Sequence, residues 1–90
     1  MMTEREILWR LRGKNHLIAM FSFLKFHMSA EDNVLVTEDF EPLRAYHLIE
    51  ETDMTIQGIC KSLRLLRKYE VLKIEYHYGK RYYVLNYKGE

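Results

Sequence analysis

Apolar residues recur at helical spacing over residues 55–69, and this segment is predicted to be an amphipathic helix. The apolar positions step by three, four and three residues: Ile56, Ile59, Leu63 and Leu66. Polar and basic residues step by four, three and four on the other side: Gln57, Lys61, Arg64 and Lys68. At about 100° per residue the two sets lie on opposite faces, so one face packs in a core while the other is basic. Thr55 is a good N-cap for this helix.

A strand pattern follows the helix directly. Apolar and polar residues alternate between positions 72 and 77, and residues 81–85 form a second β-prone run. Gly79 and Lys80 separate the two runs, and glycine in the first loop position favours a two-residue type II′ turn. We therefore expect a β-hairpin over residues 71–87.

The N-terminal third is predicted to form two helices. The first begins after Thr3, which can cap it, and the second runs from an Asn15 N-cap to about Met28. One face of the second helix is apolar at Leu17, Met20, Phe21, Leu24 and Met28. Its other apolar face consists of Ala19, Phe23 and Phe26. A single core cannot cover both faces of this helix. Either the first helix or a second subunit must therefore cover the face with Ala19, Phe23 and Phe26.

Two short elements connect these helices to the C-terminal half. Val34–Val36 is short, rich in β-branched residues and bounded by polar residues, which predicts a brief strand. Pro42 suits the first turn of a following helix that ends near Glu51. A tight connection over Thr52–Met54 then leads to the amphipathic helix.

These elements predict a single α+β domain over residues 1–90. Residues 1–30 form the N-terminal helices, residues 40–69 a helix-turn-helix, and residues 71–87 the hairpin. A composition of 48% hydrophobic and 30% charged residues is ordinary for a folded domain.

The net charge of +1 conceals a segregation of charge along the chain. Residues 1–30 carry five basic and two acidic side chains, and residues 54–90 carry eight basic and three acidic ones. Between them, residues 31–53 carry eight acids and a single base, Arg44. A basic C-terminal segment favours a polyanionic partner, although a solvated surface explains the charges as well.

The segment from Asp53 to Leu72 resembles the winged helix-turn-helix transcription regulators of the MarR and PadR types. The positions that carry the resemblance are Met54, Thr55, Ile59, Leu63, Leu66, Val71 and Leu72. Leu85–Gly89 is similar to the step that closes the wing in those families. The resemblance covers residues 34–89 and implies a winged helix-turn-helix, with three to four helices and a C-terminal hairpin as its wing.

The chain departs from the family pattern in two respects. Asp53 and Glu70 stand where glycine is usual, and a left-handed backbone suits Asp better than Glu. The C-terminal dimerisation helix of many such regulators has no counterpart before Glu90, so their dimer geometry is not implied.

Together, the resemblance and the charge pattern predict a sequence-specific double-stranded DNA-binding protein that regulates transcription. A helix in the major groove needs one face fixed to its domain and long hydrogen-bond donors on the other. Gln57 suits adenine, whereas Lys61 and Arg64 suit guanine edges or phosphates. Thr55 can bind a phosphate at the helix start. The remaining candidates are Lys68 on the helix and, at the hairpin tip, Lys80 and Arg81.

Two other functions are compatible with the same features. A winged helix can instead bind proteins, as an adaptor or subunit whose acidic segment 31–53 meets a basic partner. The tyrosines of the hairpin can stack single-stranded bases, although cross-strand packing also explains them. The histidines are scattered and Cys60 is the only cysteine, so we expect no metal, no cofactor and no catalytic residue.

The second apolar face upstream favours a homodimer. Its two-fold interface would consist of Trp9, Leu11, Ala19, Phe23 and Phe26. Such a dimer would place two recognition helices on successive major grooves. No signal peptide or membrane span is visible, so we expect a cytoplasmic or nucleoid-associated protein. So small a stand-alone domain also suits a virus.

Overall fold

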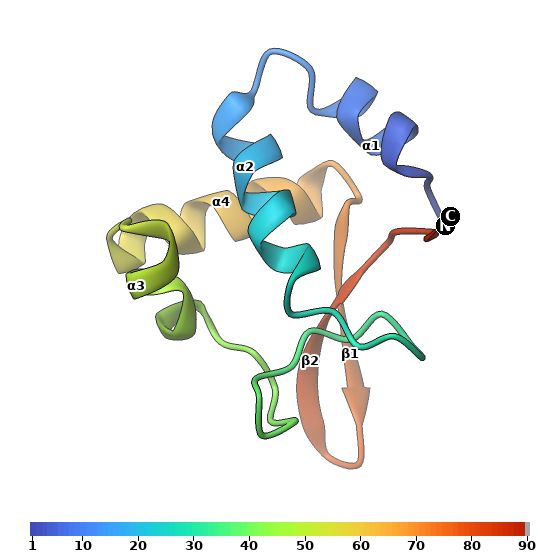
Figure 1. The fold of residues 1–90 in the computed structure, drawn as a ribbon, viewed down its shortest axis with the longest axis vertical. Coiled ribbons are helices and arrows are strands. Elements are labelled where there is room, and N and C mark those ends of the chain that lie inside the picture. Colours follow the sequence, from blue (N-terminus) through green and yellow to red (C-terminus); the bar gives the residue numbers. More distant parts are fainter. Residues whose placement is uncertain (90) are drawn as a thin grey trace.

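A computed structural model describes residues 1–89, in which helices precede a C-terminal β-hairpin (Figure 1). Within these residues the four α-helices are α1 (Glu4–Arg10), α2 (Asn15–Lys25), α3 (Ile49–Thr52) and α4 (Ile56–Lys68). A 3₁₀ turn, η1 (Ala45–Leu48), directly precedes α3. The hairpin pairs β1 (Leu72–His77) with β2 (Lys80–Leu85) in antiparallel register. The predicted α+β class is confirmed.

The first helix starts where the sequence predicts. The Thr3 hydroxyl accepts a hydrogen bond from the Glu6 backbone N–H (3.2 Å), and the Glu6 carboxylate accepts one from the Thr3 backbone N–H (3.1 Å). This capping box satisfies N–H groups that would otherwise lack partners. The pKa of the Glu6 carboxyl is lowered because the Thr3 backbone N–H, and then the Thr3 hydroxyl, donate hydrogen bonds to it.

The second helix, α2, differs from its prediction at both ends. Asn15 is the first helical residue rather than the cap, and Lys14 occupies the cap position without a side-chain hydrogen bond. The helix ends at Lys25, before the predicted Met28, because the following N–H groups bond to carbonyls three residues back. Met28 then forms an antiparallel bridge with Leu35.

The core lies between α2, α4 and the adjoining end of the hairpin. The buried face of α2 consists of Leu17, Met20, Phe21 and Leu24. The residues that α4 and the hairpin add to the same cluster are Ile59, Leu63, Leu66, Val71, Leu72 and Leu85. Leu11 also belongs to this core with 0% of its surface exposed, so its predicted place in a dimer interface is wrong.

The segment at 34–36 pairs with β2, on the side of β2 away from β1. Val34 forms an antiparallel bridge with Val84, and the Leu35 N–H donates to the Tyr83 carbonyl (2.8 Å). The predicted brief strand is thus present as isolated bridges. Its backbone hydrogen bonds pair the edge of β2 that faces away from β1.

The hairpin loop differs from its prediction by one position. Tyr78 and Gly79 form the two-residue loop, and their positive φ angles of 54° and 77° are those of a type I′ turn. Lys80 belongs to β2, so the predicted Gly79–Lys80 type II′ loop is wrong. The register that pairs Leu72 with Leu85 and buries both determines where the loop falls.

Pro42 does not begin a helix, contrary to the prediction. It forms an isolated bridge with Val36, and the N–H of Leu43 donates to the Leu35 carbonyl (3.0 Å). This extended pairing keeps the chain out of a helix until Ala45.

Two acidic residues, Asp53 and Glu70, have a left-handed backbone, which glycine adopts most readily. Asp53 has φ 57° after α3, and Glu70 has φ 64° after α4. At the end of α4 the N–H of Glu70 donates to the Arg67 carbonyl (3.0 Å) and that of Val71 to the Leu66 carbonyl (2.9 Å). These two bonds form a Schellman motif. Val71 and Leu66 are both buried, so the motif joins α4 firmly to β1.

Glu70→Gly should stabilise the protein by roughly 0.5–1 kcal/mol, because the relief of left-handed strain outweighs the extra freedom that glycine gives the unfolded chain. The carboxylate that is lost lies 3.8 Å from Arg10 Nη1 and is largely exposed, so this ion pair contributes little. Urea denaturation measures the difference, with Glu70→Ala as the control that keeps the strain. Equal stability of the two variants would contradict the assignment.

The Glu6 carboxyl should titrate below the usual range of glutamate pKa values. A pKa lowered in the folded state means that the cap stabilises α1 fully above the unfolded-state pKa. That contribution is lost as the pH falls through the folded-state value. NMR titration of the carboxyl carbon measures this pKa, and Thr3→Ala should raise it part of the way back. A wild-type Glu6 with an ordinary pKa would show that the cap does not form.

Candidate nucleic-acid interface

One face of α4 is anchored in the core. Thr55 caps the helix as predicted, because its hydroxyl accepts a hydrogen bond from the Gly58 N–H (3.1 Å). Ile59, Leu63 and Leu66 are buried, as predicted. Ile56 is not: it is 36% exposed, because the first turn of α4 is incompletely covered.

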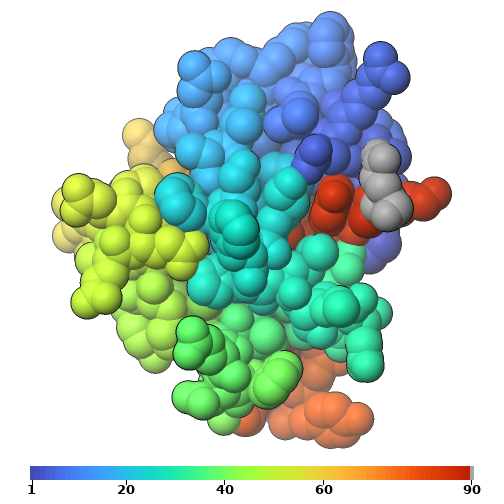
Figure 2. Space-filling view, in the orientation of Figure 1, coloured from blue at the N-terminus to red at the C-terminus, as the bar shows by residue number. Residues whose placement is uncertain are grey.

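The opposite face of α4 is exposed and carries no acidic residue. Its members follow one another at helical spacing: Gln57, Cys60, Lys61, Arg64, Arg67 and Lys68. We call Gln57 and the four bases of this set the basic face. None of the four bases forms an ion pair with an acid of residues 1–89. In Figure 1, α2 crosses in front of α4, and Figure 2 shows little of α4 from that side. The basic face is therefore on the side of α4 that α2 leaves uncovered.

The basic surface continues from α4 onto the start of β1. A shallow hollow of about 650 Å³ is lined by Arg64, Arg67, Lys68, Leu72, Lys73 and Ile74. The predicted site omits Arg67, and it includes Lys73 only as a weaker candidate. Helical spacing could have identified Arg67, which follows Arg64 by three residues.

The bases of the hairpin are less available than those of α4. Lys80 Nζ lies 3.1 Å from Glu41 Oε2, so an acid of the preceding loop compensates its charge. The Arg81 guanidinium lies 5.7 Å from the centre of the Tyr83 ring, and the Arg81 carbonyl accepts a hydrogen bond from Arg44 (2.8 Å). The hairpin loop lies at the lower end of Figure 1, well away from α4. The structure therefore brings Lys80 and Arg81 together with the acidic segment rather than with the basic face.

The tyrosines of the hairpin divide into packed and exposed side chains. Tyr87 packs edge-on against an aromatic ring of α2 (centroids 5.7 Å), and Tyr82 packs edge-on against His77 (5.8 Å). Tyr76 and Tyr78 are exposed near the loop. Packing therefore explains Tyr82 and Tyr87, whereas Tyr76 and Tyr78 remain exposed.

Four of the five predicted dimer residues reach the surface. Trp9 on α1 is 67% exposed, and Phe26 at the end of α2 is 83% exposed. Ala19 is exposed and Phe23 is half-buried on the outer face of α2. Since Ala19 is open to solvent, α1 does not cover that face.

No protein-family model, no curated protein and no solved structure matches the chain. Within residues 1–89, no helix is long and apolar enough to cross a membrane. Over the same residues, no three His, Cys, Asp or Glu side chains come together in a way that could hold a metal ion. A functional assignment therefore rests on the physical arrangement of the surface.

The two faces of α4 should respond differently to truncation. Leu63→Ala removes a buried side chain and should destabilise the fold by about 2–5 kcal/mol. Lys61→Ala removes an exposed, unpaired side chain and should change stability by less than about 0.5 kcal/mol. Urea unfolding followed by circular dichroism measures both. Similar losses in the two variants would contradict the rotation of α4 described above.

Proposed function

We propose that the protein is a winged helix that binds double-stranded DNA through the basic face of α4. The observation that carries this proposal is the two-sided character of α4. One side is fixed by three buried side chains, and the other presents four exposed bases and Gln57. A helix of this kind can enter a groove without losing its hold on the domain.

The order of the elements supports a winged helix. Helix α2 is followed by the bridged segment at 34–36, then by α3, a tight turn, α4 and the hairpin. Asp53 turns the chain with its left-handed backbone, and Thr55 caps α4 two residues later. The segment at 34–36 pairs with β2, as the first strand of a winged helix pairs with the last.

The length and chemistry of α4 suit the major groove. Its 13 residues span about 20 Å, and the major groove is about 12 Å wide. Gln57 can bind adenine through two hydrogen bonds, and Lys61 or Arg64 can donate to guanine. The proposed phosphate contacts, nearer the hairpin, are Arg67, Lys68 and Lys73.

The hairpin has a secondary part in this proposal. Arg81 is exposed and can bind a phosphate as it stands, whereas Lys80 must first leave Glu41. Glu38 and Asp39 lie in the same loop and repel a polyanion. A hairpin contact should therefore contribute less than the α4 contacts.

A protein that binds DNA without catalysing a reaction acts by occupying its binding site. We therefore assign the protein a role in regulating transcription, in the cytoplasm or on the nucleoid. This assignment needs no cofactor and no catalytic residue, and its partner is a DNA duplex.

Affinity for duplex DNA should fall steeply with salt, and the effect should map to the basic face. Each phosphate contact contributes about 0.9 to the slope of log K against log salt concentration, so Arg67→Ala should reduce that slope by about one. Lys61→Ala/Arg64→Ala should in addition reduce the preference for a selected sequence over a random duplex. Fluorescence anisotropy at several salt concentrations measures both quantities.

Two variants serve as controls for this titration. Lys88→Ala removes one exposed base beside Met2 at the chain ends and should keep wild-type affinity. Lys80→Ala/Arg81→Ala should weaken binding less than Lys61→Ala/Arg64→Ala does. Its loss of affinity should be the same for all DNA sequences. Equal affinity of the wild type and the α4 variants for every duplex would overturn the proposed function.

A further inference from the structure

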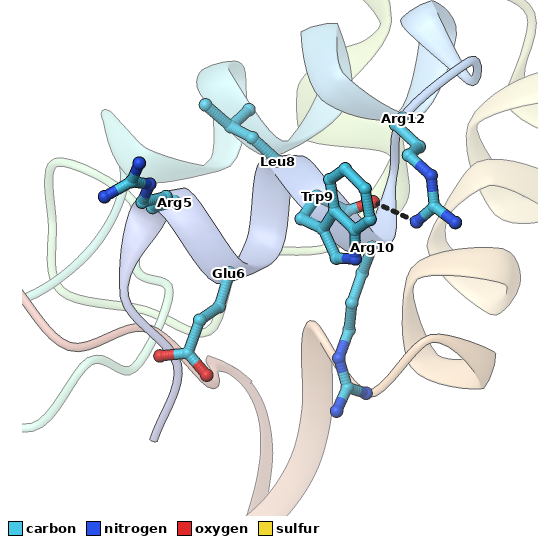
Figure 3. A pocket seen from close by; sticks show the side chains of 6 residues that line it. All are labelled: Arg5, Glu6, Leu8, Trp9, Arg10 and Arg12. Carbon is cyan, nitrogen blue, oxygen red and sulfur yellow. Dashed lines mark hydrogen bonds between the residues drawn. The ribbon is translucent and has the colours of Figure 1, made fainter.

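Two exposed aromatic patches lie outside the basic face, and the first is on α1. Trp9 is the largest side chain of this patch, with Leu8 also exposed beside it. Figure 3 shows the Trp9 ring between Arg10 and Arg12, with Arg5 on the preceding turn of the helix. The Arg12 guanidinium carbon lies 4.0 Å from the ring centroid. We call Arg5, Leu8, Trp9 and Arg12 the α1 patch.

The chemistry of the α1 patch is that of a protein-binding surface. Trp and Arg are the residue types that contribute most to binding at interfaces, and a tryptophan can bury about 200 Å². Neither Arg5 nor Arg12 forms an ion pair with an acid of residues 1–89. The nearby acid, Glu6, is already hydrogen-bonded in the capping box of α1. The patch is therefore apolar and positively charged.

The second patch is a groove on the loop that connects α2 to η1. It has a volume of about 560 Å³, and Phe26 and Phe40 both line it with most of their surface exposed. Glu31 and Glu38 line the same groove, and neither pairs with a base in the described part of the chain. We call it the acidic groove. It is apolar and negatively charged.

Phe40 is held in a conformation that a bulky residue rarely adopts. Its φ is 62°, in the left-handed region, and 79% of its surface is exposed. Three hydrogen bonds fix this turn: from the Phe40 N–H to the Thr37 carbonyl (2.9 Å), from the Thr37 N–H to the Glu41 carbonyl (2.8 Å), and from the Glu41 N–H to the Thr37 hydroxyl (3.2 Å). The strained backbone disfavours the folded state, and the exposed ring contributes no burial to offset that strain. Burial of the ring by a partner would supply that offset.

We propose that the acidic groove of one copy of the protein binds the α1 patch of another copy. Arg5 and Arg12 can pair with Glu31 and Glu38, while Trp9 packs on the exposed phenylalanines of the groove. The positive, apolar patch and the negative, apolar groove are complementary in both charge and polarity.

The two surfaces lie far apart on one molecule. In Figure 1, α1 is at the upper end of the long axis and the loop at 36–41 is near the lower end. The α1 patch of one copy therefore cannot reach the acidic groove of the same copy. The contact joins different surfaces of its two partners, so copies add head to tail and form an open chain unless their rotation closes a ring.

This inference does not depend on the proposed DNA binding, because neither surface includes the basic face. An interface of one helix turn and one groove is small, so the association is weak and sensitive to salt. It is measured without DNA, and its failure leaves the proposed function untouched.

Sedimentation velocity of the full chain tests the inference. At low salt, the weight-average sedimentation coefficient of the wild type should rise with protein concentration. Trp9→Ala and Phe40→Gly should each weaken self-association by about tenfold or more. Phe40→Gly also relieves the left-handed strain, so unfolding cannot explain its loss of association. Tyr76→Ala removes a similarly exposed aromatic residue from the hairpin and should change nothing.

A mixture of the two variants gives the sharpest result. The Trp9→Ala chain keeps its acidic groove, and the Phe40→Gly chain keeps its α1 patch. One intact pair of surfaces remains, so the mixture should form a pair of unlike chains although neither variant associates alone. A wild type that stays monomeric at every concentration would overturn the inference and favour a basic segment of another protein as the occupant. Loss of association in only one of the variants would also overturn it and favour a two-fold dimer.

Discussion

The burial of Ile59, Leu63 and Leu66 fixes the rotation of α4 about its own axis, and the arrangement of the surface follows from that rotation. These three side chains lie on one face of the helix and are almost inaccessible to solvent. A shift of one residue turns the helix by about 100° and would bring basic side chains toward the core, where an unpaired charge is strongly unfavourable. The exposure of the basic face is therefore a consequence of core packing. It requires no separate stabilising contact.

The Schellman motif at Glu70 carries this geometry from α4 into the hairpin. Val71 is buried directly after the turn, so β1 starts from the core and the hairpin runs outward from it. The loop at 36–41 then lies against the far part of the hairpin, where Glu41 binds Lys80. Glu41 thus compensates a base of the hairpin, whereas none of the bases of α4 forms an ion pair with an acid of residues 1–89.

Features set by neighbouring residues are predicted well from the sequence. The caps at Thr3 and Thr55 depend on a few consecutive residues, and the spacing of Leu63 and Leu66 identifies the buried side of α4 directly. The left-handed backbone at Glu70 also follows from its position after a helix. The fold class and the basic side of α4 could be predicted from the sequence for this reason.

Features that depend on partners distant in the sequence are not predicted. Pro42 is a plausible helix start by local rules, but pairing with Val36 overrides them. Lys80 reads as a free base at a hairpin tip, because its partner Glu41 lies 39 positions away. Leu11 reads as part of an exposed stripe until the whole core is assembled around it.

The bridge between Val34 and Val84 also constrains the order in which the chain can fold. The helix α4, its Schellman motif and the hairpin are contiguous in sequence, so their contacts close only short loops. The bridge joins two distant positions and forms favourably only after β2 is in place. We therefore expect the loop that holds Phe40 to be the last segment to reach its native conformation, and the first to exchange its amide hydrogens when the protein opens locally.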